Sequence, residues 1–323
     1  MIEAHLLLLF LALLLDRVVG DPPWLWSRLP HPVVLFGKAI SFFDQLLNRP
    51  GFPDGLRRAG GVVTILLLLA LSLAVGVALH LIFAALGLLG LLLEVVVAAV
   101  FLAQKSLIDH VVAVADGLRH DGLAGGRRAV SMIVGRDPSV LDEAGVARAA
   151  LESLSENFAD GVVAPAFWYG LLGLPGLIAY KMLNTADSMI GHKSEKYLRF
   201  GWASARLDDV ANWPAARLAG FLILCSCWIS QGRAAARRGL SVVMTDHGLH
   251  RSPNSGWPEA AAAGALDVAL AGPRIYGGEK VQEPMMNAAG ERVIGGADIR
   301  RGLGLIDGAW RVGVGLVIVM MLI

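Results

Sequence analysis

The sequence predicts an all-α fold: a polytopic integral membrane helical protein with partly embedded broken helices and a polar cavity that faces the cytoplasm. Its 323 residues are 55% hydrophobic, and the mean hydropathy is +0.60. Only 17% of them are charged, whereas soluble domains carry about 25%. Several apolar runs approach or exceed the length that a helix needs to cross a hydrocarbon core of about 30 Å. Together these observations exclude an ordinary soluble domain.

The charge balance and the cysteines exclude further classes of protein. The formal net charge is +1 and no run of Lys or Arg forms a basic tail, so we expect no nucleic-acid partner. Cys225 and Cys227 are separated by one residue in an apolar stretch. This spacing makes a disulfide geometrically implausible and leaves zinc without enough ligands. We expect both thiols to pack as small hydrophobic groups.

Four segments are predicted to span the membrane. The first apolar run lacks the basic region and the small-residue cleavage site of a signal peptide, so we interpret it as a retained helix. The run 62–103 is too long for one crossing and predicts two helices, joined near His80 or within Gly87 to Gly90. The predicted spans are Ile2 to Leu15, Val62 to Leu79, Leu81 to Ala103 and Val312 to Ile323.

Two other apolar stretches, Val162 to Tyr180 and Ala215 to Ser230, are expected to lie only partly in the membrane. Five residues that weaken or break a helix lie in the first stretch: Pro165, Gly170, Gly173, Pro175 and Gly176. Basic residues crowd the loops at 17–58 and 105–148, which predicts a cytoplasmic position for both. A full crossing by the first stretch would leave the basic segment Lys181 to Arg206 outside. We therefore expect the polar region between the two stretches to open to the cytoplasm.

Helix signals flank these stretches. Ser139 or Asp142 can cap a helix that continues through the following residues. Ser204 to Leu218 also has a helical pattern, which Pro214 should kink.

The late part of the chain is rich in Gly, Pro, Asn and Ala. No strand signal is strong there, and His247 to Gly296 is predicted to form loops around one short helix, Pro258 to Leu270. No internal repeat or low-complexity linker divides the sequence, so we predict a single domain, 1–323.

Polar and ionisable residues concentrate at helical spacings in three patches between residues 152 and 217. A carboxylate near hydrocarbon costs about 2 to 3 kcal/mol, so many such groups predict a shared, hydrated, cation-binding site. We interpret it as an active site. In chain order the patches are Glu152, Glu156, Asn157 and Asp160; then Lys181, Asn184 and Asp187; then Arg206, Asp208, Asp209 and Asn212.

In the first patch, Glu152 and Glu156 stand four residues apart and share one helix face, and Asp160 lies near that face if the helix persists. The row suits Mg²⁺, which takes one or two carboxylates together with substrate phosphate oxygens. The alternative is a solvated helix face. In the second patch, Lys181 could meet a phosphate, and Asp187 either binds metal or pairs with Lys181.

In the third patch, adjacent Asp208 and Asp209 repel each other unless a cation or an arginine joins them, and Arg206 cannot serve both. Three such patches would suit a phosphate site with one or two metals. No GxxxxGK[ST] element occurs, so a nucleotide is not held by a standard P-loop. Outside the patches, His31 either contacts substrate or structures a Pro-rich turn. Trp257 either stacks on a flat ligand or anchors the chain at the membrane interface.

Short motifs in this order along nearly the whole chain are similar to those of a known family. They are Leu15-Asp16, Gly20-Asp21-Pro22, His31-Pro32-Val33, Gly135-Arg136-Asp137, Leu141-Asp142, Glu152-Ser153, Glu156-Asn157, Asp160-Gly161, Tyr180-Lys181, Asn184 to Met189, Gly201 to Asp209 and Asn254 to Glu259. The sequence resembles the adenosylcobinamide-phosphate synthase family of cobalamin biosynthesis (CobD/CbiB). The ordered set is far more specific than any single patch.

The resemblance implies an enzyme of the cell inner membrane, and the loop charges predict that its active site faces the cytoplasm. Such an enzyme uses ATP and Mg²⁺ to join a propionate carboxyl of adenosylcobyric acid to (R)-1-amino-2-propanol or its O-phosphate in an amide bond. The corrinoid and the aminopropanol phosphate follow from the family alone. Activation of the carboxyl as an acyl phosphate would build up charge that metal and cationic side chains neutralise.

Residue roles follow from combining this reaction with the patches. The expected catalytic residues are Glu152, Glu156, Asp187, Lys181 and Arg206. The expected metal ligands are Glu152, Glu156, Asp160, Asp187, Asp208 and Asp209. The expected substrate-binding residues are Asn157, Asn184, Asn212, His31, Trp202, Asn254 and Trp257. The asparagines would orient substrate amides or water, and Trp202 or Trp257 would offer a stacking face.

Two other functions fit part of the pattern. A membrane prenyl- or phospho-alcohol transferase would also use acidic helices, but it would act on a lipid diphosphate without ATP. A non-enzymatic membrane regulator of the same superfamily would keep the hydrophobic frame without needing the acidic patches, all three of which are present here. The expected partners are the two substrates and the lipid bilayer. Homo-oligomerisation and association with other corrin-pathway membrane enzymes stay open.

Overall fold

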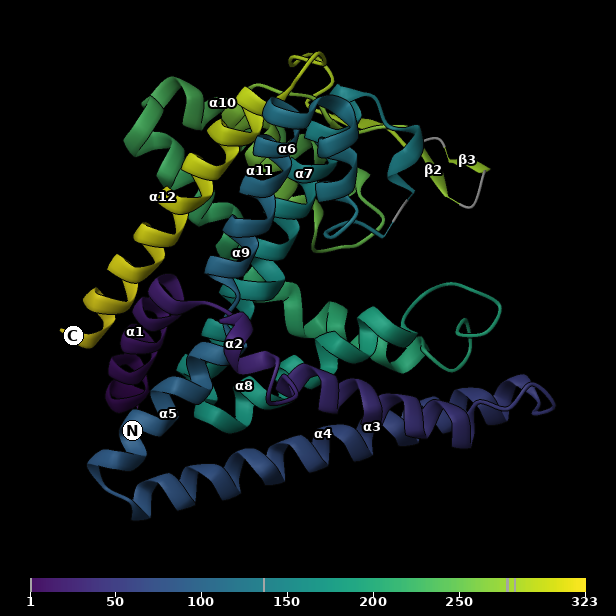
Figure 1. The fold of residues 1–323 in the computed structure, drawn as a ribbon, viewed down its shortest axis with the longest axis vertical. Coiled ribbons are helices and arrows are strands. Elements are labelled where there is room, and N and C mark those ends of the chain that lie inside the picture. Colours follow the sequence, from purple (N-terminus) through teal and green to yellow (C-terminus); the bar gives the residue numbers. More distant parts are fainter. Residues whose placement is uncertain (1, 136, 277–278, 282) are drawn as a thin grey trace. The chain divides into compact units, whose positions relative to one another are not determined.

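The computed structural model describes residues 2–135, 137–276, 279–281 and 283–323, so Arg136 of the motifs above lies outside the described residues. The fold is all-α apart from a few short strands, as predicted (Figure 1). The chain divides into two compact units, each built from two segments of sequence. Unit 1 comprises residues 1–103 and 164–212, and unit 2 comprises residues 104–163 and 213–323.

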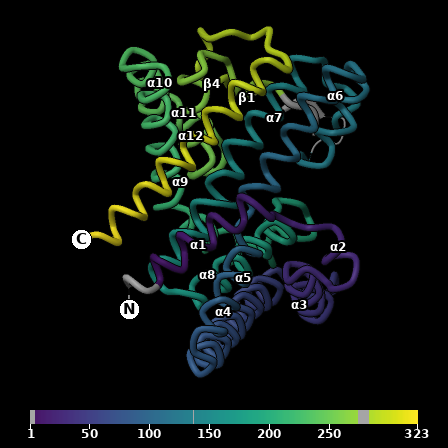
Figure 2. Tube along the Cα trace, turned by 60° about the vertical axis from the view of Figure 1, so that its left-hand side comes forward, coloured from purple at the N-terminus to yellow at the C-terminus, as the bar shows by residue number. Residues whose placement is uncertain are grey.

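Unit 1 is a helical assembly around one long helix, α4. Helix α4 packs against α3, α5 and α8, and α1 packs against α5 and α8. The tube in Figure 2 shows α3 and α4 lying side by side. Buried side chains such as Ile40, Leu68, Met182 and Phe200 form its core. The helices are α1 (Ile2–Val19), α2 (Pro23–Trp26), α3 (Pro32–Leu47), α4 (Asp54–Ala85), α5 (Leu88–Phe101), α8 (Ala164–Ile190) and the first part of α9 (Trp202–Gln231).

The two helices predicted within residues 62–103 are confirmed, and they form a helical hairpin. Helix α4 ends at Ala85 and α5 begins at Leu88, with Gly87 between them at φ +58°. That backbone conformation is one that only glycine adopts without strain. At Gly90 an added Cβ atom would lie 1.8 Å from the Phe83 carbonyl oxygen, so the two helix ends approach too closely for a side chain. The turn therefore lies at Gly87, and His80, the alternative, stays inside α4.

Helix α8 is broken, as predicted for this stretch, but at one residue only. Gly173 has φ +64° and ψ −154° and separates two helical pieces. Pro165 lies in the first turn of α8, where a missing amide donor costs little, and Pro175 lies in the first turn after the break. The left-handed glycine, rather than either proline, is therefore what interrupts the helix.

Unit 2 surrounds α7, which carries the first acidic patch. Helix α7 packs against α6, α11 and α12. Asp142, one of the two predicted caps, begins α7 by accepting a hydrogen bond from the Gly145 amide at 2.7 Å. The elements are α6 (Gln104–Val130), η1 (Pro138–Val140), α7 (Glu143–Phe158), η2 (Ala159–Val163), the rest of α9, α10 (Arg233–Asp246), η3 (His247–Leu249), α11 (Gly256–Leu266) and α12 (Gly296–Met321).

The late segment contains short strands that the sequence did not predict. Strand β1 (Leu270–Ala271) pairs antiparallel with β4 (Met285–Met286). Strand β2 (Arg274–Tyr276) pairs antiparallel with β3 (Glu279–Val281). The predicted short helix is present as α11, although it starts and ends slightly earlier than expected. Strands of two or three residues are too short to show the alternation that reveals a strand in a sequence.

Within the described residues, five helices are long and apolar enough to cross a membrane, which makes this a multi-pass membrane protein. They are Asp54–Ala85, Leu88–Val130, Glu143–Ile190, Trp202–Gln231 and Gly296–Met321. The third and fourth contain the two stretches predicted to be partly embedded, and by length and composition both can cross.

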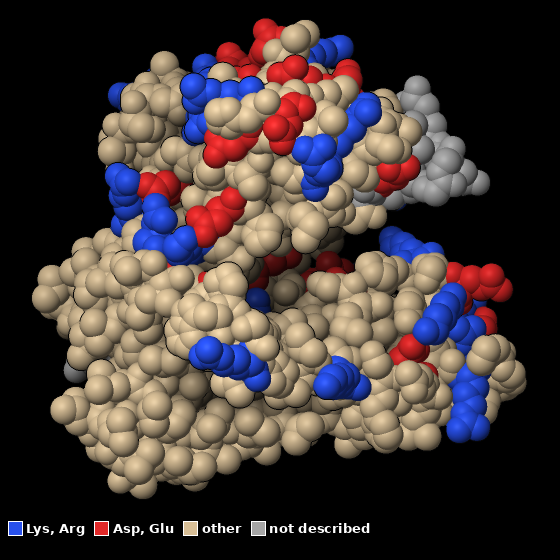
Figure 3. Space-filling model, viewed as in Figure 1, with Lys and Arg blue, Asp and Glu red and all other residues tan. Residues whose placement is uncertain are grey.

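Figure 3 shows one face, on which the end of unit 1 at the α4–α5 hairpin is almost uncharged while charged side chains gather where α4 begins.

Candidate active site

The strongest candidate site in unit 1 is a buried carboxylate, Asp208, held by side-chain amides. Asn212 Nδ2 donates to Asp208 Oδ2 at 2.9 Å, and Asn184 Nδ2 approaches Asp208 Oδ1 at 3.4 Å. Tyr180 in turn donates its hydroxyl to Asn212 Oδ1 at 2.8 Å. Asp208 and Asn212 are buried and come from α9, whereas Tyr180 and Asn184 come from α8. We call these four residues the amide network.

Further predicted residues of unit 1 lie around the amide network. Asp187 is close enough to Asp208 for an electrostatic interaction between the two carboxylates. A Cβ atom at Gly191 would lie 1.9 Å from Asp187 Oδ1, so only glycine leaves room for this carboxylate. Asp209 is half-buried, and Arg206 Nη1 lies 3.9 Å from Asp209 Oδ2 in a surface pair. The structure therefore separates the adjacent acids: Asp208 faces the amides and Asp209 faces Arg206.

In unit 2, Glu152 holds the backbone of the late segment. Its Oε1 accepts a hydrogen bond from the Ala271 amide at 2.8 Å, and both groups are buried. Ala271 has φ +58°, a left-handed conformation that costs an alanine about 1 to 2 kcal/mol. A buried carboxylate aimed at the amide of such a residue stabilises that local conformation.

The remaining residues of the first patch also have defined surroundings. Glu156 Oε1 accepts a hydrogen bond from the Ser255 hydroxyl at 2.7 Å. Asn157 is exposed and donates to the carbonyl oxygen of Ser153 at 2.8 Å. Asp160 lies in η2, a π-helical turn, rather than in a continued α-helix. Such turns widen a helix by one residue and occur often at functional sites.

One cluster in unit 2 contains a residue that the sequence analysis did not single out, Arg217. Its Nη1 donates to Asn254 Oδ1 at 2.8 Å and to the Trp213 carbonyl oxygen at 2.9 Å. The guanidinium lies 4.5 Å from the ring centroid of Trp213 and 4.7 Å from that of Trp257. His247 also contacts the Trp257 ring, with centroids 4.4 Å apart. The indole of Trp257 is therefore packed by a cation and an imidazole, and stacking on a substrate stays a prediction.

Two other predicted substrate-binding residues make contacts within unit 1. His31 is the N-cap of α3: its Nδ1 accepts a hydrogen bond from the Val33 amide at 3.2 Å, and its ring packs on Trp26. These contacts fit the second predicted role of His31, which is to structure the Pro-rich turn. Trp202 is exposed, and the Arg58 guanidinium lies 3.8 Å from its ring centroid. Substrate contacts by either residue stay predictions.

A second buried acid of unit 1, Glu94, lies outside the three predicted patches. Tyr169 donates its hydroxyl to Glu94 Oε1 at 2.8 Å, and His80 Nδ1 lies 3.6 Å from Glu94 Oε2. The His5 ring packs against both Tyr169 and His80. Glu94 stands in a leucine- and valine-rich run, and an acid in such a run is itself a signal of a buried polar contact.

The donor chemistry fits a hard cation. The predicted metal ligands that the structure describes are carboxylates, and the groups beside Asp208 are amides and another carboxylate. Across the described ranges, no three or more His, Cys, Asp or Glu side chains form a group that could hold a metal ion. Mg²⁺ bound by one or two carboxylates and by phosphate oxygens needs no such group. The assignment of metal ligands therefore stays a prediction.

The three predicted patches divide between the units. Glu152, Glu156 and Asp160 belong to unit 2, whereas the second and third patches belong to unit 1. The structure brings the second and third patches together through the hydrogen bond from Asn184 to Asp208 and the electrostatic interaction between Asp187 and Asp208. That all three patches line one cavity stays a prediction.

The comparisons with known proteins agree with one another. The family model described as CobD/Cbib protein matches residues 9–306. A Cobalamin biosynthesis protein CobD of Sinorhizobium sp is 65% identical over 323 residues, the full length of both chains. Proteins of that name are 68% identical over 294 residues in Rhizobium meliloti (91% of this chain, 90% of the relative) and 53% identical over 321 residues in Brucella suis (99% and 98%). No solved structure matches the chain. The resemblance drawn from the ordered motifs is therefore confirmed, and the chain belongs to the CobD/CbiB family.

Proposed function

We propose that this chain is an adenosylcobinamide-phosphate synthase, an ATP- and Mg²⁺-dependent acid–amine ligase of cobalamin biosynthesis. Its substrates would be adenosylcobyric acid and (R)-1-amino-2-propanol or its O-phosphate. Membership of the CobD/CbiB family supports the pathway. The single observation that supports the chemistry is the buried carboxylate of Asp208 held by two asparagine amides beside a second carboxylate.

The proposed reaction balances in two steps. A carboxylate oxygen of the corrinoid attacks the γ-phosphorus of ATP, the bond to the β,γ-bridging oxygen breaks, and ADP leaves. The amine then attacks the acyl carbon, inorganic phosphate leaves with the C–O bond electrons, and the nitrogen loses a proton. One amide forms for each ATP cleaved.

The residues of unit 1 supply groups suited to the first step. We assign Asp208 and Asp187 as ligands for Mg²⁺, which when bound would neutralise phosphate charge. The amides of Asn184 and Asn212 hold the Asp208 carboxylate in place, as such outer partners do for metal ligands. Lys181 and Arg206 are proposed to contact phosphate oxygens. Glu156 and Asp160 remain proposed ligands from unit 2.

Glu152 receives a different assignment. One of its oxygens already accepts a hydrogen bond from a strained backbone amide, and withdrawing it toward a metal would leave that buried amide without its acceptor. We therefore assign Glu152 to the support of β1 rather than to the metal. The cytoplasmic orientation of the site is proposed from the positive-inside rule, and the inner membrane is proposed from membership of the family.

The decisive experiment uses the full-length protein purified in detergent. It is incubated with ATP, Mg²⁺, adenosylcobyric acid and aminopropanol or its phosphate, and the amide product and ADP are quantified by mass spectrometry. We expect amide and ADP in equal amounts, and neither without the corrinoid. Turnover of a prenyl diphosphate without ATP would favour the transferase, and no turnover of any of these substrates by folded protein would favour the regulator.

A further inference from the structure

The connection between α8 and α9 lies between the two acidic residues assigned to the site in unit 1. Asp187 lies in the last turn of α8, and Asp208 lies in the second turn of α9. Residues 191–201 join the two helices and contain no α-helix. A loop of this length between catalytic groups would ordinarily be mobile, so its attachment to the rest of unit 1 matters for the geometry of both carboxylates.

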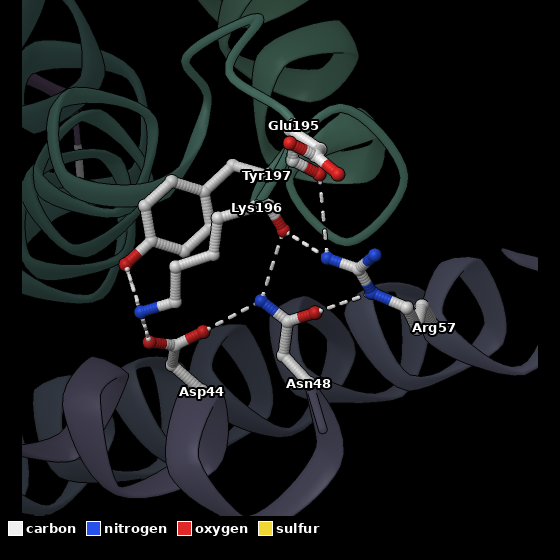
Figure 4. Close-up of polar contacts among 6 residues, drawn as sticks. All are labelled: Asp44, Asn48, Arg57, Glu195, Lys196 and Tyr197. Atoms are coloured by element: carbon white, nitrogen blue, oxygen red, sulfur yellow. Dashed lines mark hydrogen bonds and ion pairs between the residues drawn. The ribbon is translucent and has the colours of Figure 1, made fainter. Parts of the chain in front are cut away.

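A buried carboxylate on α3, Asp44, holds this loop by its side chains (Figure 4). Lys196 Nζ donates to Asp44 Oδ2 at 2.7 Å, and the Tyr197 hydroxyl donates to the same oxygen at 3.2 Å. Asn48 Nδ2 donates to Asp44 Oδ1 at 2.8 Å. The hydrogen bond to Asp44 raises the pKa of Lys196 above its ordinary value. Both carboxylate oxygens of Asp44 thus accept hydrogen bonds, and its charge is paired with an ammonium group.

The same cluster also holds the loop by its backbone. Asn48 Nδ2 donates to the carbonyl oxygen of Lys196 at 3.2 Å, and Arg57 Nη2 donates to that same oxygen. Arg57 Nε donates to Asn48 Oδ1 at 2.8 Å, which fixes the guanidinium in place. Arg57 Nη2 also lies 3.5 Å from the carbonyl oxygen of Glu195. Backbone contacts of this kind restrain the path of the loop whatever its side chains do.

The far end of the loop is buried in the apolar core. Phe200 is fully buried among Ile65, Leu68 and Ile190. A Cβ atom at Gly61 would lie 1.8 Å from the Phe200 carbonyl oxygen, so α4 and the loop are in backbone contact there. Helix α9 starts directly after this anchored point.

We propose that Asp44, Asn48, Arg57, Lys196 and Tyr197, here called the loop clamp, position Asp187 and Asp208 for the reaction by fixing the connection between α8 and α9. The inference rests on the proposed function for its kinetic consequences only. None of the five residues belongs to the predicted site, and none is assigned to touch substrate. They are positioning residues that act through the start of α9.

The same loop supplies a matched control. Arg199 Nε lies 2.9 Å from Asp54 Oδ2, but both side chains are at least half exposed. Exposed ion pairs contribute little to stability. Lys196 and Arg199 therefore both make an ion pair from this loop. The partner of Lys196, Asp44, is buried, whereas the partner of Arg199, Asp54, is exposed.

The test compares Lys196→Met, Asp44→Asn and Arg199→Met with the wild type in detergent. Amide hydrogen exchange of residues 202–212 reports positioning without any substrate, and kcat per folded molecule reports its consequence. We expect Lys196→Met to exchange at least about tenfold faster across 202–212 and to lose about tenfold or more in kcat. Arg199→Met should change neither by more than about twofold, and Lys196→Arg should restore most of both.

Each result decides a separate question. The double variant Asp44→Asn with Lys196→Met should be no worse than the poorer single variant, because each substitution removes the same ion pair between Lys196 and Asp44. Unchanged exchange at 202–212 in the folded Lys196→Met variant would overturn the proposal. Equal effects of Lys196→Met and Arg199→Met would also overturn it. If the wild type forms no amide, the exchange data still test the clamp, and only the proposed function fails.

Discussion

Two buried carboxylates, Asp208 in unit 1 and Glu152 in unit 2, are held by different kinds of donor. Asp208 accepts hydrogen bonds from side-chain amides of Asn184 and Asn212, whereas Glu152 accepts one from the backbone amide of Ala271. A side-chain amide can rotate and exchange one partner for another, but a backbone amide cannot move without its chain. The comparison favours the proposal that Asp208 binds the cation, and it explains why we assign Glu152 to the support of the fold.

Replacement of Asp208 should have the largest effect. Asp208→Ala removes the carboxylate at the centre of the amide network, and we expect kcat to fall by about 10² to 10³, the range for loss of one electrostatic stabiliser. The measurement is amide formation at saturating ATP and Mg²⁺. Asp209→Ala is the control, because Asp209 is adjacent but faces Arg206, and its loss should be at most about tenfold. Equal losses in both variants would show that the network does not distinguish the two acids.

Replacement of Glu152 should act on stability instead. Glu152→Ala leaves the buried Ala271 amide without its acceptor, which costs about 1 to 3 kcal/mol in the free energy of unfolding. Thermal unfolding in detergent measures the effect. Glu152→Gln keeps an accepting oxygen and should recover most of the lost stability. A Glu152→Ala protein as stable as the wild type would remove Glu152 from its structural role.

Shortening the amide network at its far end should have a smaller effect. Tyr180→Phe removes the hydroxyl that donates a hydrogen bond to the buried Asn212 Oδ1. We expect a cost of about 1 kcal/mol, visible as a lower unfolding temperature and a change in kcat well below that of Asp208→Ala. Tyr169→Phe is a matched control, because it also removes one buried tyrosine hydroxyl, but from Glu94. It should lower stability without changing kcat per folded molecule.

The smallest effect concerns pH. The pKa of Lys196 is raised in the folded protein by its hydrogen bond to Asp44. Its contribution to stability is therefore complete below the unfolded-state pKa of about 10.4 and is lost as the pH rises through the higher folded-state pKa. The difference in unfolding temperature between wild type and Lys196→Met should be constant from about pH 7.5 to 9.5 and shrink above about pH 10.5. A difference that grows with pH there would contradict the direction of the shift. Because Lys196 is largely exposed, solvent screens its charge, and the part of the difference that changes with pH is expected to be small.

Much of the fold could be predicted because the signals were local. Gly87 and Gly90 sit inside an apolar run too long for one helix, and they mark the hairpin between α4 and α5. Asp142 precedes the helical residues of α7 and caps them. The position of the break in α8 could not be predicted, because Pro165, Gly173 and Pro175 can each interrupt a helix. In the structure the helix is interrupted at Gly173.

Less of the site could be predicted because its contacts join distant segments. The spacing of Glu152 and Glu156 places them on one face, but nothing local indicates that Glu152 meets Ala271, which is 119 positions away. The pairing of Asp208 with Asn184 likewise depends on how α8 and α9 pack. Glu94 is the exception, because an acid within a leucine- and valine-rich run is a local signal of a buried polar contact.

The most direct test compares two isosteric variants, Asp208→Asn and Glu152→Gln, in one assay of ATP-dependent amide formation. Both remove a negative charge and keep the shape of the side chain. If the chemistry belongs to the amide network of unit 1, Asp208→Asn should lose about 10² or more in kcat per folded molecule, and Glu152→Gln should stay within about threefold of the wild type. A fully active Asp208→Asn protein, or a Glu152→Gln protein that is folded and inactive, would contradict the account.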